Sequence, residues 1–244
     1  MDLSQRIRML VRLWKYRLRE ERDSIAFMRR QPLDGRTVVD IGANKGIYSY
    51  WMSQQVGPRG KVIAFEPQPE LLTHLDEFKQ SFGLTNLEIV GKGLSNRRGT
   101  VAMHRDKPGA LGASLAVEQE SAATIGSMES IDVEVVTLDE FCEEARTGPI
   151  AFIKCDVEGH ELAVFEGARR TLQTDRPVLL FECHHHEAER GALFKFLTDL
   201  GYEGLFFERG SPHPYSHFRD VPYRKPTIRF RNYMFAHRDS PAAG

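Results

Sequence analysis

The stretch VVDIGANKG, residues 38–46, predicts a buried β-strand that ends at an acid and passes into a loop with two glycines. A helical pattern follows, and a second apolar run ends at Glu66. This order is that of a βαβ unit, which binds ligands at the carboxyl ends of its strands. We therefore expect Gly42 and Gly46 to bring the backbone close to a ligand, and Glu66 to accept hydrogen bonds from two ribose hydroxyls.

The loop between Gly42 and Gly46 lacks the three-glycine pattern that seats the pyrophosphate of a dinucleotide. Asp40 lies directly before this loop, where its charge would repel a phosphate and attract an ammonium group. A nucleoside that carries an amino acid satisfies Asp40 and Glu66 together, and S-adenosylmethionine is the common one. We expect its carboxylate to accept hydrogen bonds from backbone N–H groups at 43–46. The alternative is that the two glycines only form a tight turn.

The composition is that of an ordinary globular protein, with 244 residues of which 41% are hydrophobic and 27% charged. Three cysteines without CxxC spacing indicate a reducing compartment. The sequence has neither a signal-peptide pattern nor a run of about 18 apolar residues, so we expect a cytoplasmic location.

The N-terminal segment is basic. The first 30 residues hold nine Arg/Lys and four Asp/Glu, a net +5, whereas the remaining 24 basic and 30 acidic residues give −6. Apolar residues at helical spacing predict one amphipathic helix over 3–30. We favour packing of this helix across the main domain as a cap, and docking on a membrane or partner stays open. Aromatic residues among the arginines are too few to indicate nucleic-acid binding. The spaced apolar residues are Leu3, Ile7, Leu10, Trp14, Leu18, Ile25 and Met28.

From residue 36 onward, short β-like runs alternate with helical ones, which predicts a doubly wound α/β fold with a parallel sheet and an antiparallel last strand. We expect domain boundaries at 1–35 for the basic helix and turn, 36–238 for the α/β domain and 239–244 for a tail. Expected strands are 37–41, 61–66, 87–90, 150–156, 177–183, 202–208 and 227–237, with an inserted hairpin near 100–104 and 131–137. Expected helices are 47–56, 69–82, 138–145, 158–172 and 187–200. Residues 105–130 are expected to form a mobile loop over the site, and 211–226 a His/Pro-rich loop.

Acid–base chemistry is expected at the ends of the fourth and fifth strands, next to the ligand crevice. Asp156 could act as a base or hold an acceptor hydroxyl, but it could equally cap the next helix. His160 could be a base near neutral pH or a hydrogen-bonded wall residue. Glu182 and His184 lie two apart on one face of a strand and could converge with Asp156. These three residues are also a possible set of ligands for a divalent metal ion.

Several motifs in order resemble the FkbM family of S-adenosylmethionine-dependent methyltransferases. The motifs are DIGANKG (40–46) with Tyr48-Ser49, FEPQP (65–69), IKCDVEGHE (153–161) and LFE (180–182). The resemblance covers about residues 36–200 and implies a Rossmann-like, seven-stranded methyltransferase sheet. It also implies O-methylation of a hydroxyl on a sugar, a glycan or glycolipid, or a polyketide-like natural product. Cys155 departs from the aliphatic residue common in the family, and the segment 3–30 lies outside the shared motifs.

Two hypotheses of different classes follow. The first is an S-adenosylmethionine-dependent O-methyltransferase, with Asp156, Glu182, His184 and His160 as candidates on the acceptor side and a metal-assisted variant as an alternative. The second is a non-catalytic cofactor-binding adaptor that docks through its basic N-terminal helix. Residues expected to contact the cofactor are Asp40, Gly42, Ala43, Asn44, Gly46, Tyr48, Glu66, Pro67, Leu94 and Asp156.

Overall fold

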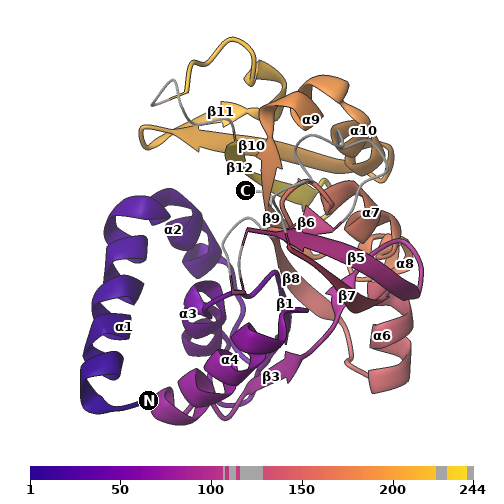
Figure 1. Cartoon of the computed structure of the whole chain (residues 1–244). Helices are drawn as coiled ribbons and strands as arrows, with labels where there is room; N and C mark the ends of the chain where they lie inside the picture. Colours follow the sequence, from indigo (N-terminus) through magenta and orange to yellow (C-terminus); the bar gives the residue numbers. More distant parts are fainter. Residues whose placement is uncertain (107, 110–113, 116–128, 224–229, 241–244) are drawn as a thin grey trace.

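The computed structural model describes residues 1–106, 108–109, 114–115, 129–223 and 230–240. Its main sheet has the order β11-β10-β12-β9-β8-β1-β2-β3 (Figure 1). The strands from β3 to β9 are parallel to their neighbours, whereas β12 is antiparallel to both β9 and β10. In sheet order the strands are β11 (Ser211–Pro214), β10 (Tyr202–Glu208), β12 (Phe230–His237), β9 (Val178–His184), β8 (Ile150–Cys155), β1 (Thr37–Ile41), β2 (Lys61–Phe65) and β3 (Leu87–Val90).

The expected fold class is confirmed. Seven of these strands form the methyltransferase-type sheet, and β11 adds an eighth through a hairpin with β10. A short 3₁₀ turn, η2 (Tyr215–His217), follows within the His/Pro-rich loop. The central strand β1 is flanked by β2 and β8, so the ends of these three strands meet in one place.

Helices bury both faces of the sheet. Side chains alternate along β1, with Val38 in one hydrophobic cluster and Val39 in the other. The first face is covered by α2 (Arg22–Arg30), α3 (Ile47–Val56) and α4 (Pro69–Phe82). The second face is covered by α6 (Leu138–Ala145), α7 (Glu161–Glu166), α8 (Arg169–Thr174), α9 (His185–Arg190) and α10 (Ala192–Asp199).

Two predicted single helices are in fact pairs, so both predictions were wrong. In place of 158–172, α7 starts only at Glu161, because Glu158 and Gly159 have positive φ angles of 52° and 96°. α7 and α8 are then separated at Gly167, where a Cβ atom would lie 2.1 Å from the backbone oxygen of Ser95. In place of 187–200, α9 is ended by Gly191 in the left-handed conformation, and α10 follows it.

A small second sheet has the order β4-β7-β5-β6. The antiparallel pairing of β5 and β7 confirms the expected hairpin, while β4 and β6 were not predicted. Most of the predicted loop 105–130 lies outside the described residues, as do 224–229 and 241–244. The four strands are β4 (Gly93–Leu94), β5 (Gly99–Arg105), β6 (Ser114–Leu115) and β7 (Glu129–Val136).

The N-terminal segment is not one helix, so that prediction was also wrong. It consists of α1 (Leu3–Lys15), a π-helical turn η1 (Tyr16–Glu20) and α2. The backbone leaves helical geometry at Glu21, whose carboxylate binds side chains of the main domain, and π-helical turns often mark such functional positions.

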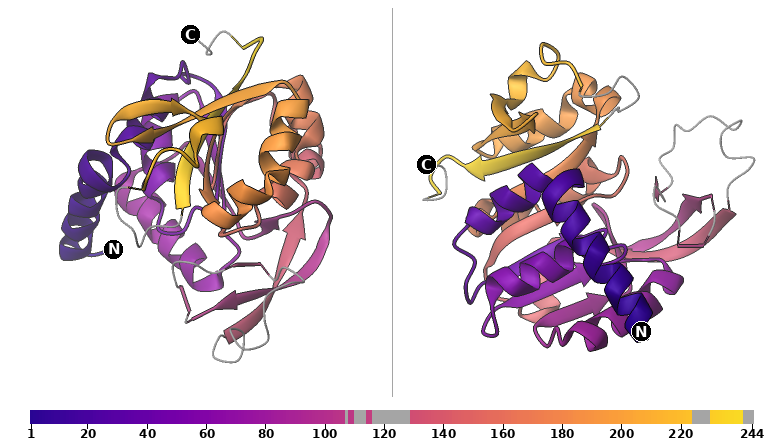
Figure 2. Two further views of the ribbon diagram at one scale, coloured as in Figure 1. Left: turned by 90° about the horizontal axis from the view of Figure 1, so that it is seen from above. Right: turned by 90° about the vertical axis from the view of Figure 1, so that its left-hand side faces the viewer.

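As expected, the N-terminal segment packs across the main domain as a cap, lying along α3 and α4 (Figure 2). Met9, Leu13, Ile25 and Met28 are buried in the same cluster as α3. Within the described part of the chain, no helix is long and apolar enough to cross a membrane.

Candidate active site

The loop between β1 and α3 is shaped by two glycines with left-handed backbones, at φ +75° for Gly42 and +79° for Gly46. A Cβ atom on Gly42 would lie 2.0 Å from the backbone oxygen of Asp156, and one on Gly46 would lie 2.9 Å from the ring of Phe78. The first glycine therefore lets the loop touch the end of β8, and the second lets it pack against α4.

The backbone N–H groups of this loop are already used within the protein. Ala43 N donates to the backbone oxygen of Phe65, Asn44 N to a carboxylate oxygen of Glu66, and Gly46 N to the backbone oxygen of Ala43, over 2.8–3.0 Å. Three of the donors at 43–46 that we expected to bind a cofactor carboxylate are therefore engaged within the protein. Ala43 N and Asn44 N fix the loop to the end of β2, and Gly46 N closes a turn within the loop.

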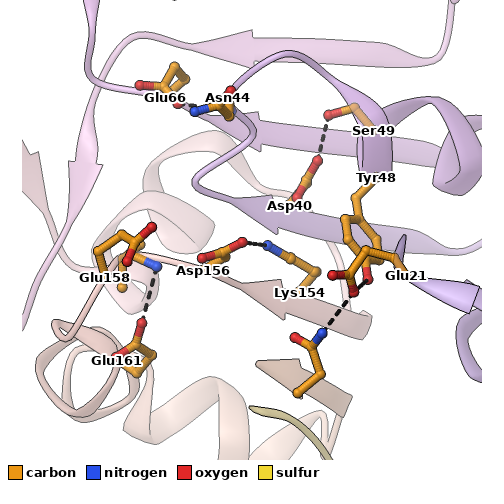
Figure 3. Close-up of polar contacts among 12 residues, drawn as sticks. Glu21, Asp40, Asn44, Tyr48, Ser49, Glu66, Lys154, Asp156, Glu158 and Glu161 are labelled. Carbon is orange, nitrogen blue, oxygen red and sulfur yellow. Dashed lines mark hydrogen bonds and ion pairs between the residues drawn. The ribbon is translucent and has the colours of Figure 1, made fainter. Parts of the chain in front are cut away.

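Glu66 is held at the end of β2 by two backbone donors. Its carboxylate accepts from Asn44 N at 2.9 Å (Figure 3) and from Gln68 N at 3.0 Å. Burial raises the pKa of Glu66 to about 7, and the two backbone hydrogen bonds oppose this rise. The Gln68 side chain also hydrogen-bonds this carboxylate, and the remaining lone pairs of its two oxygens let Glu66 accept from a ligand hydroxyl.

Asp40 at the end of β1 is buried, and only one of its two carboxylate oxygens accepts a hydrogen bond from a described residue. Oδ2 accepts a hydrogen bond from Ser49 Oγ at 2.6 Å, while Oδ1 has no partner among the described residues. Burial raises the pKa of Asp40, and the nearby Lys154 ammonium opposes the rise. A buried carboxylate oxygen without a partner fits a ligand that donates hydrogen bonds, such as an ammonium group.

One pocket collects most of the predicted cofactor residues. Gly46 does not line it and serves the packing of α4 instead. Leu94 and Met103 form apolar parts of its wall, contributed by the small sheet. The predicted residues that do line the pocket are Asp40, Gly42, Ala43, Asn44, Tyr48, Glu66, Pro67, Leu94 and Asp156.

Opposite the loop, β8 brings a buried cation to the pocket. Lys154 Nζ lies 2.7 Å from Asp156 Oδ2 and 4.9 Å from the centre of the Tyr48 ring (Figure 3). Burial lowers the pKa of Lys154, but the carboxylates of Asp156 and Asp40 outweigh it, so its pKa is raised. We did not predict a site role for Lys154, although a charged residue inside an apolar strand is a signal for one.

Asp156 is therefore a pocket residue paired with a lysine, not a helix cap. The N-cap of α7 is His160, and Glu161 fills the space behind the loop by accepting from the N–H groups of Val157 and Gly159. The capping alternative for Asp156 was wrong, since the chain makes a left-handed turn before α7 begins.

The N-terminal segment supplies part of the pocket wall, which the sequence did not suggest. Glu21 Oε2 accepts from Tyr48 Oη at 2.9 Å and from Asn232 Nδ2 at 2.7 Å, and burial raises the pKa of Glu21. Arg12 and Tyr16 also line the pocket, and Arg12 Nε is buried with no partner among the described residues. The fold brings these residues together from distant parts of the chain, so no local motif predicts them.

Two of the predicted acceptor-side residues lie beside the pocket rather than in its wall. His184 Nε2 lies 3.2 Å from Glu158 Oε2, and this hydrogen bond raises the pKa of His184. Burial, then repulsion from Asp156 and Glu158, raises the pKa of Glu182. Ligand atoms of Glu158, Glu182 and His184 lie within 4.8 Å of one another, so Glu158 takes the place predicted for Asp156 in the possible metal set.

His160 lies away from the pocket. Its Nε2 is 2.9 Å from Ser95 Oγ, and burial lowers the pKa of its ring. His160 is hydrogen-bonded, as one alternative expected, but it does not line the pocket and so belongs neither to its wall nor to the groups that could act as a base there.

Comparison with known proteins places this geometry in a family. Hexuronic acid methyltransferase AglP of Haloferax volcanii is 28% identical over 163 residues, which are 66% of this chain and 62% of AglP. The 2-O-methyltransferase NoeI of Sinorhizobium fredii is 26% identical over 153 residues, 57% of this chain and 60% of NoeI. This chain thus spans about three fifths of the length of these two relatives.

Solved structures share the fold. Methyltransferase FkbM from Methylobacillus flagellatus superposes with a TM-score of 0.56 at 16% identity, covering 85% of this chain and 44% of that one. The Streptococcus mutans protein SMU.1697c, solved in complex with SAH, gives 0.52 at 12% identity, covering 87% and 94%. The family description "Methyltransferase FkbM domain" matches residues 40–203, and this protein therefore belongs to the FkbM methyltransferase family.

Proposed function

We propose that this protein is an S-adenosylmethionine-dependent O-methyltransferase that methylates a hydroxyl of a sugar or glycan. The observation that carries the proposal is one pocket in which Asp40 and Glu66 lie at adjacent strand ends and Asp156 faces them from the next strand. Asp40 and Glu66 can accept hydrogen bonds from the amino-acid and ribose parts of the cofactor. Asp156, on the other side, can interact with the hydroxyl that is methylated.

The residues present fit the cofactor. Glu66 would accept hydrogen bonds from the ribose hydroxyls, and the unpartnered Oδ1 of Asp40 would accept from the ammonium group. Leu94 and Met103 would contact the adenine ring. With the loop N–H groups engaged elsewhere, the buried, unpartnered Nε of Arg12 is the donor that we assign to the cofactor carboxylate. The cofactor supplies a methyl group on a positively charged sulfur.

In the transfer step, the acceptor oxygen forms a bond to the methyl carbon, the sulfur–carbon bond breaks, and the hydroxyl loses its proton. Asp156 lines the pocket, so we assign it the role of base or of the acceptor that orients the hydroxyl. Lys154 holds its carboxylate in place through their ion pair. Glu182 and His184 stay candidates for accepting the proton from Asp156. Glu158 lines the pocket and is hydrogen-bonded to His184, which connects His184 to the pocket.

A second pocket indicates where the acceptor would enter. It borders the first through Glu21 and Asn232, which line both. Its wall includes Phe207 and Tyr223, and aromatic faces with nearby polar groups suit a sugar ring. The printed names of AglP and NoeI, a hexuronic acid methyltransferase and a 2-O-methyltransferase, support a sugar as acceptor.

A metal-assisted version of the same reaction is the second candidate, favoured by the Glu158, Glu182 and His184 cluster. Activity that falls in EDTA and returns with Mg²⁺ or Mn²⁺ would support it. Full activity in EDTA would leave the three residues as acid–base groups only.

The main test combines binding and turnover. We expect calorimetric titration to show binding of S-adenosylhomocysteine and none of NAD, and mass spectrometry to show methyl-labelled glycans after incubation with labelled cofactor. Binding of NAD alone would overturn the proposal. Binding of S-adenosylhomocysteine without turnover on any of a broad panel of glycans, lipids and small hydroxylated molecules would favour the non-catalytic adaptor.

A further inference from the structure

An apolar stripe covers the outer face of α1 and η1. Its side chains are between 37% and 73% exposed, and Phe230 is the only other large hydrophobic residue in the described part of the chain that is exposed to this degree. On the opposite face of α1, Met9 and Leu13 are buried against the main domain. The stripe consists of Leu3, Ile7, Leu10, Val11, Trp14 and Leu18.

The stripe is bordered by basic residues. At the helical period of about 100° per residue, Arg6 falls on one edge of the stripe, and Arg8 and Lys15 fall on the other. All three are exposed, as is Arg19 in η1. The sequence of α1 contains no Asp or Glu, and neither Arg8 nor Arg19 forms an ion pair with another described residue.

We propose that this stripe docks α1 onto an anionic lipid surface, with the helix axis in the plane of the interface. An exposed apolar face with arginines and lysines at its edges matches the chemistry of acyl chains below negatively charged head groups. α1 lies on the outside of the molecule (Figures 1 and 2), and the side chains of the stripe are exposed along it, with Trp14 also packing edge-on against Trp51 of α3.

A second copy of this chain is a less suitable partner for the stripe. Pairing two copies through α1 would bring together two segments that each carry a net +5 over 30 residues. A nucleic acid would satisfy the arginines but leave the apolar side chains exposed to water. An anionic membrane is the partner that satisfies both parts of the surface.

Docking would also place the pocket near the membrane. Arg12 on α1 and Tyr16 at the start of η1 line the candidate active site. A membrane-bound α1 would therefore hold the pocket close to sugars displayed at a lipid surface. The docking proposal does not depend on methyl transfer, because binding to vesicles is measured without substrate.

The test is flotation of the full-length protein with vesicles of phosphatidylcholine, alone or mixed with phosphatidylglycerol. We expect binding to the mixed vesicles that weakens as salt is raised, and at least about a tenfold loss of binding in an Ile7→Gln, Val11→Gln double variant. An Arg8→Glu, Arg19→Glu variant should lose binding as well. The matched control, Arg190→Glu with Lys195→Glu, makes the same charge change at exposed positions on α9 and α10 and should bind as the wild type does.

S-adenosylhomocysteine affinity in the same variants shows that the pocket is intact, since neither Ile7 nor Val11 lines it. Equal binding of the wild type and the Ile7, Val11 variant, or absence of binding to anionic vesicles, would overturn the proposal. A wild-type dimer in sedimentation that dissociates in the Ile7, Val11 variant would overturn it in favour of a second copy.

Discussion

The β1–β2 side of the pocket holds the buried carboxylates of Asp40 and Glu66, and the β8–β9 side holds Lys154 with the half-buried carboxylates of Asp156 and Glu182. The two sides stabilise their carboxylates differently. Glu66 is held by two backbone N–H groups from its own βαβ unit, and Asp40 by the hydroxyl of Ser49. The β8–β9 side instead gathers its carboxylates around the ammonium of Lys154, whose charge also opposes the rise in the pKa of Asp40 across the pocket. Local hydrogen bonds make the first side rigid, whereas the second side depends on a balance of charge that substrate or protons can change.

The largest effect should come from removing the cation at the centre of the β8–β9 side. We expect Lys154→Met to lower the free energy of unfolding by about 3–5 kcal/mol, because buried Asp40 and half-buried Asp156 would lose their counter-charge. Lys92→Met is the matched control. Lys92 also lines the pocket but pairs with Glu134 near the surface, so it should cost only about 0–1 kcal/mol. Urea unfolding measures both, and equal losses would show that Lys154 does not balance the site.

On the β1–β2 side, Glu66→Ala should weaken S-adenosylhomocysteine binding by about 1–3 kcal/mol through loss of charged hydrogen bonds. Glu88→Ala, on β3 and outside the pocket, should have no effect. Calorimetry tests both variants, and unchanged affinity in the first would remove Glu66 from the cofactor site.

The same residue predicts a pH dependence. The pKa of Glu66 is about 7, and its ionised form accepts hydroxyl hydrogen bonds better, so wild-type affinity should fall as the pH is lowered through 7. The Glu66→Ala variant should lack this change. A wild-type affinity that is constant between pH 6 and about pH 8 would contradict the assigned role.

A smaller effect is expected where the N-terminal segment lines the pocket. Arg12→Gln should weaken S-adenosylhomocysteine binding about tenfold, as for one charge-assisted hydrogen bond. It should leave 5′-methylthioadenosine binding unchanged, because that nucleoside lacks the carboxylate. Arg8→Gln, exposed on the same helix, is the control. Equal losses for both ligands in the Arg12 variant would mean that Arg12 supports the fold and not the carboxylate.

The smallest effect should be a shift in the pH–rate profile. The Glu158 carboxylate raises the pKa of His184, so Glu158→Gln should lower it. If His184 takes part in proton transfer, the rising limb of the rate moves to lower pH in this variant. A limb that stays in place in Glu158→Gln, and in His184→Ala with full activity, would exclude His184 from catalysis.

The sequence by itself determined the β1–β2 side. Asp40, Gly42 and Glu66 follow one another within a single βαβ unit, whose strands pair in register, so local pattern predicts both the fold class and the residues that line this side of the pocket. The bounds of α3, α4 and β3 also followed from local pattern. Local pattern did not predict that Ala43 N and Asn44 N donate to Phe65 and Glu66 at the end of β2, because packing of the loop against β2 chooses these acceptors.

Only the tertiary structure decided which residues meet on the β8–β9 side and how the N-terminal segment packs on the main domain. Left-handed backbone at Glu158 and Gly159 delays α7, which changes Asp156 from a possible cap into a partner of Lys154. Glu21 and Asn232 lie 211 residues apart and meet only because η1 and β12 pack beside the same strand ends. Hydrophobic periodicity predicted that residues 3–30 were amphipathic, but which apolar side chains face the core and which face solvent depended on the π-helical turn and on packing against α3.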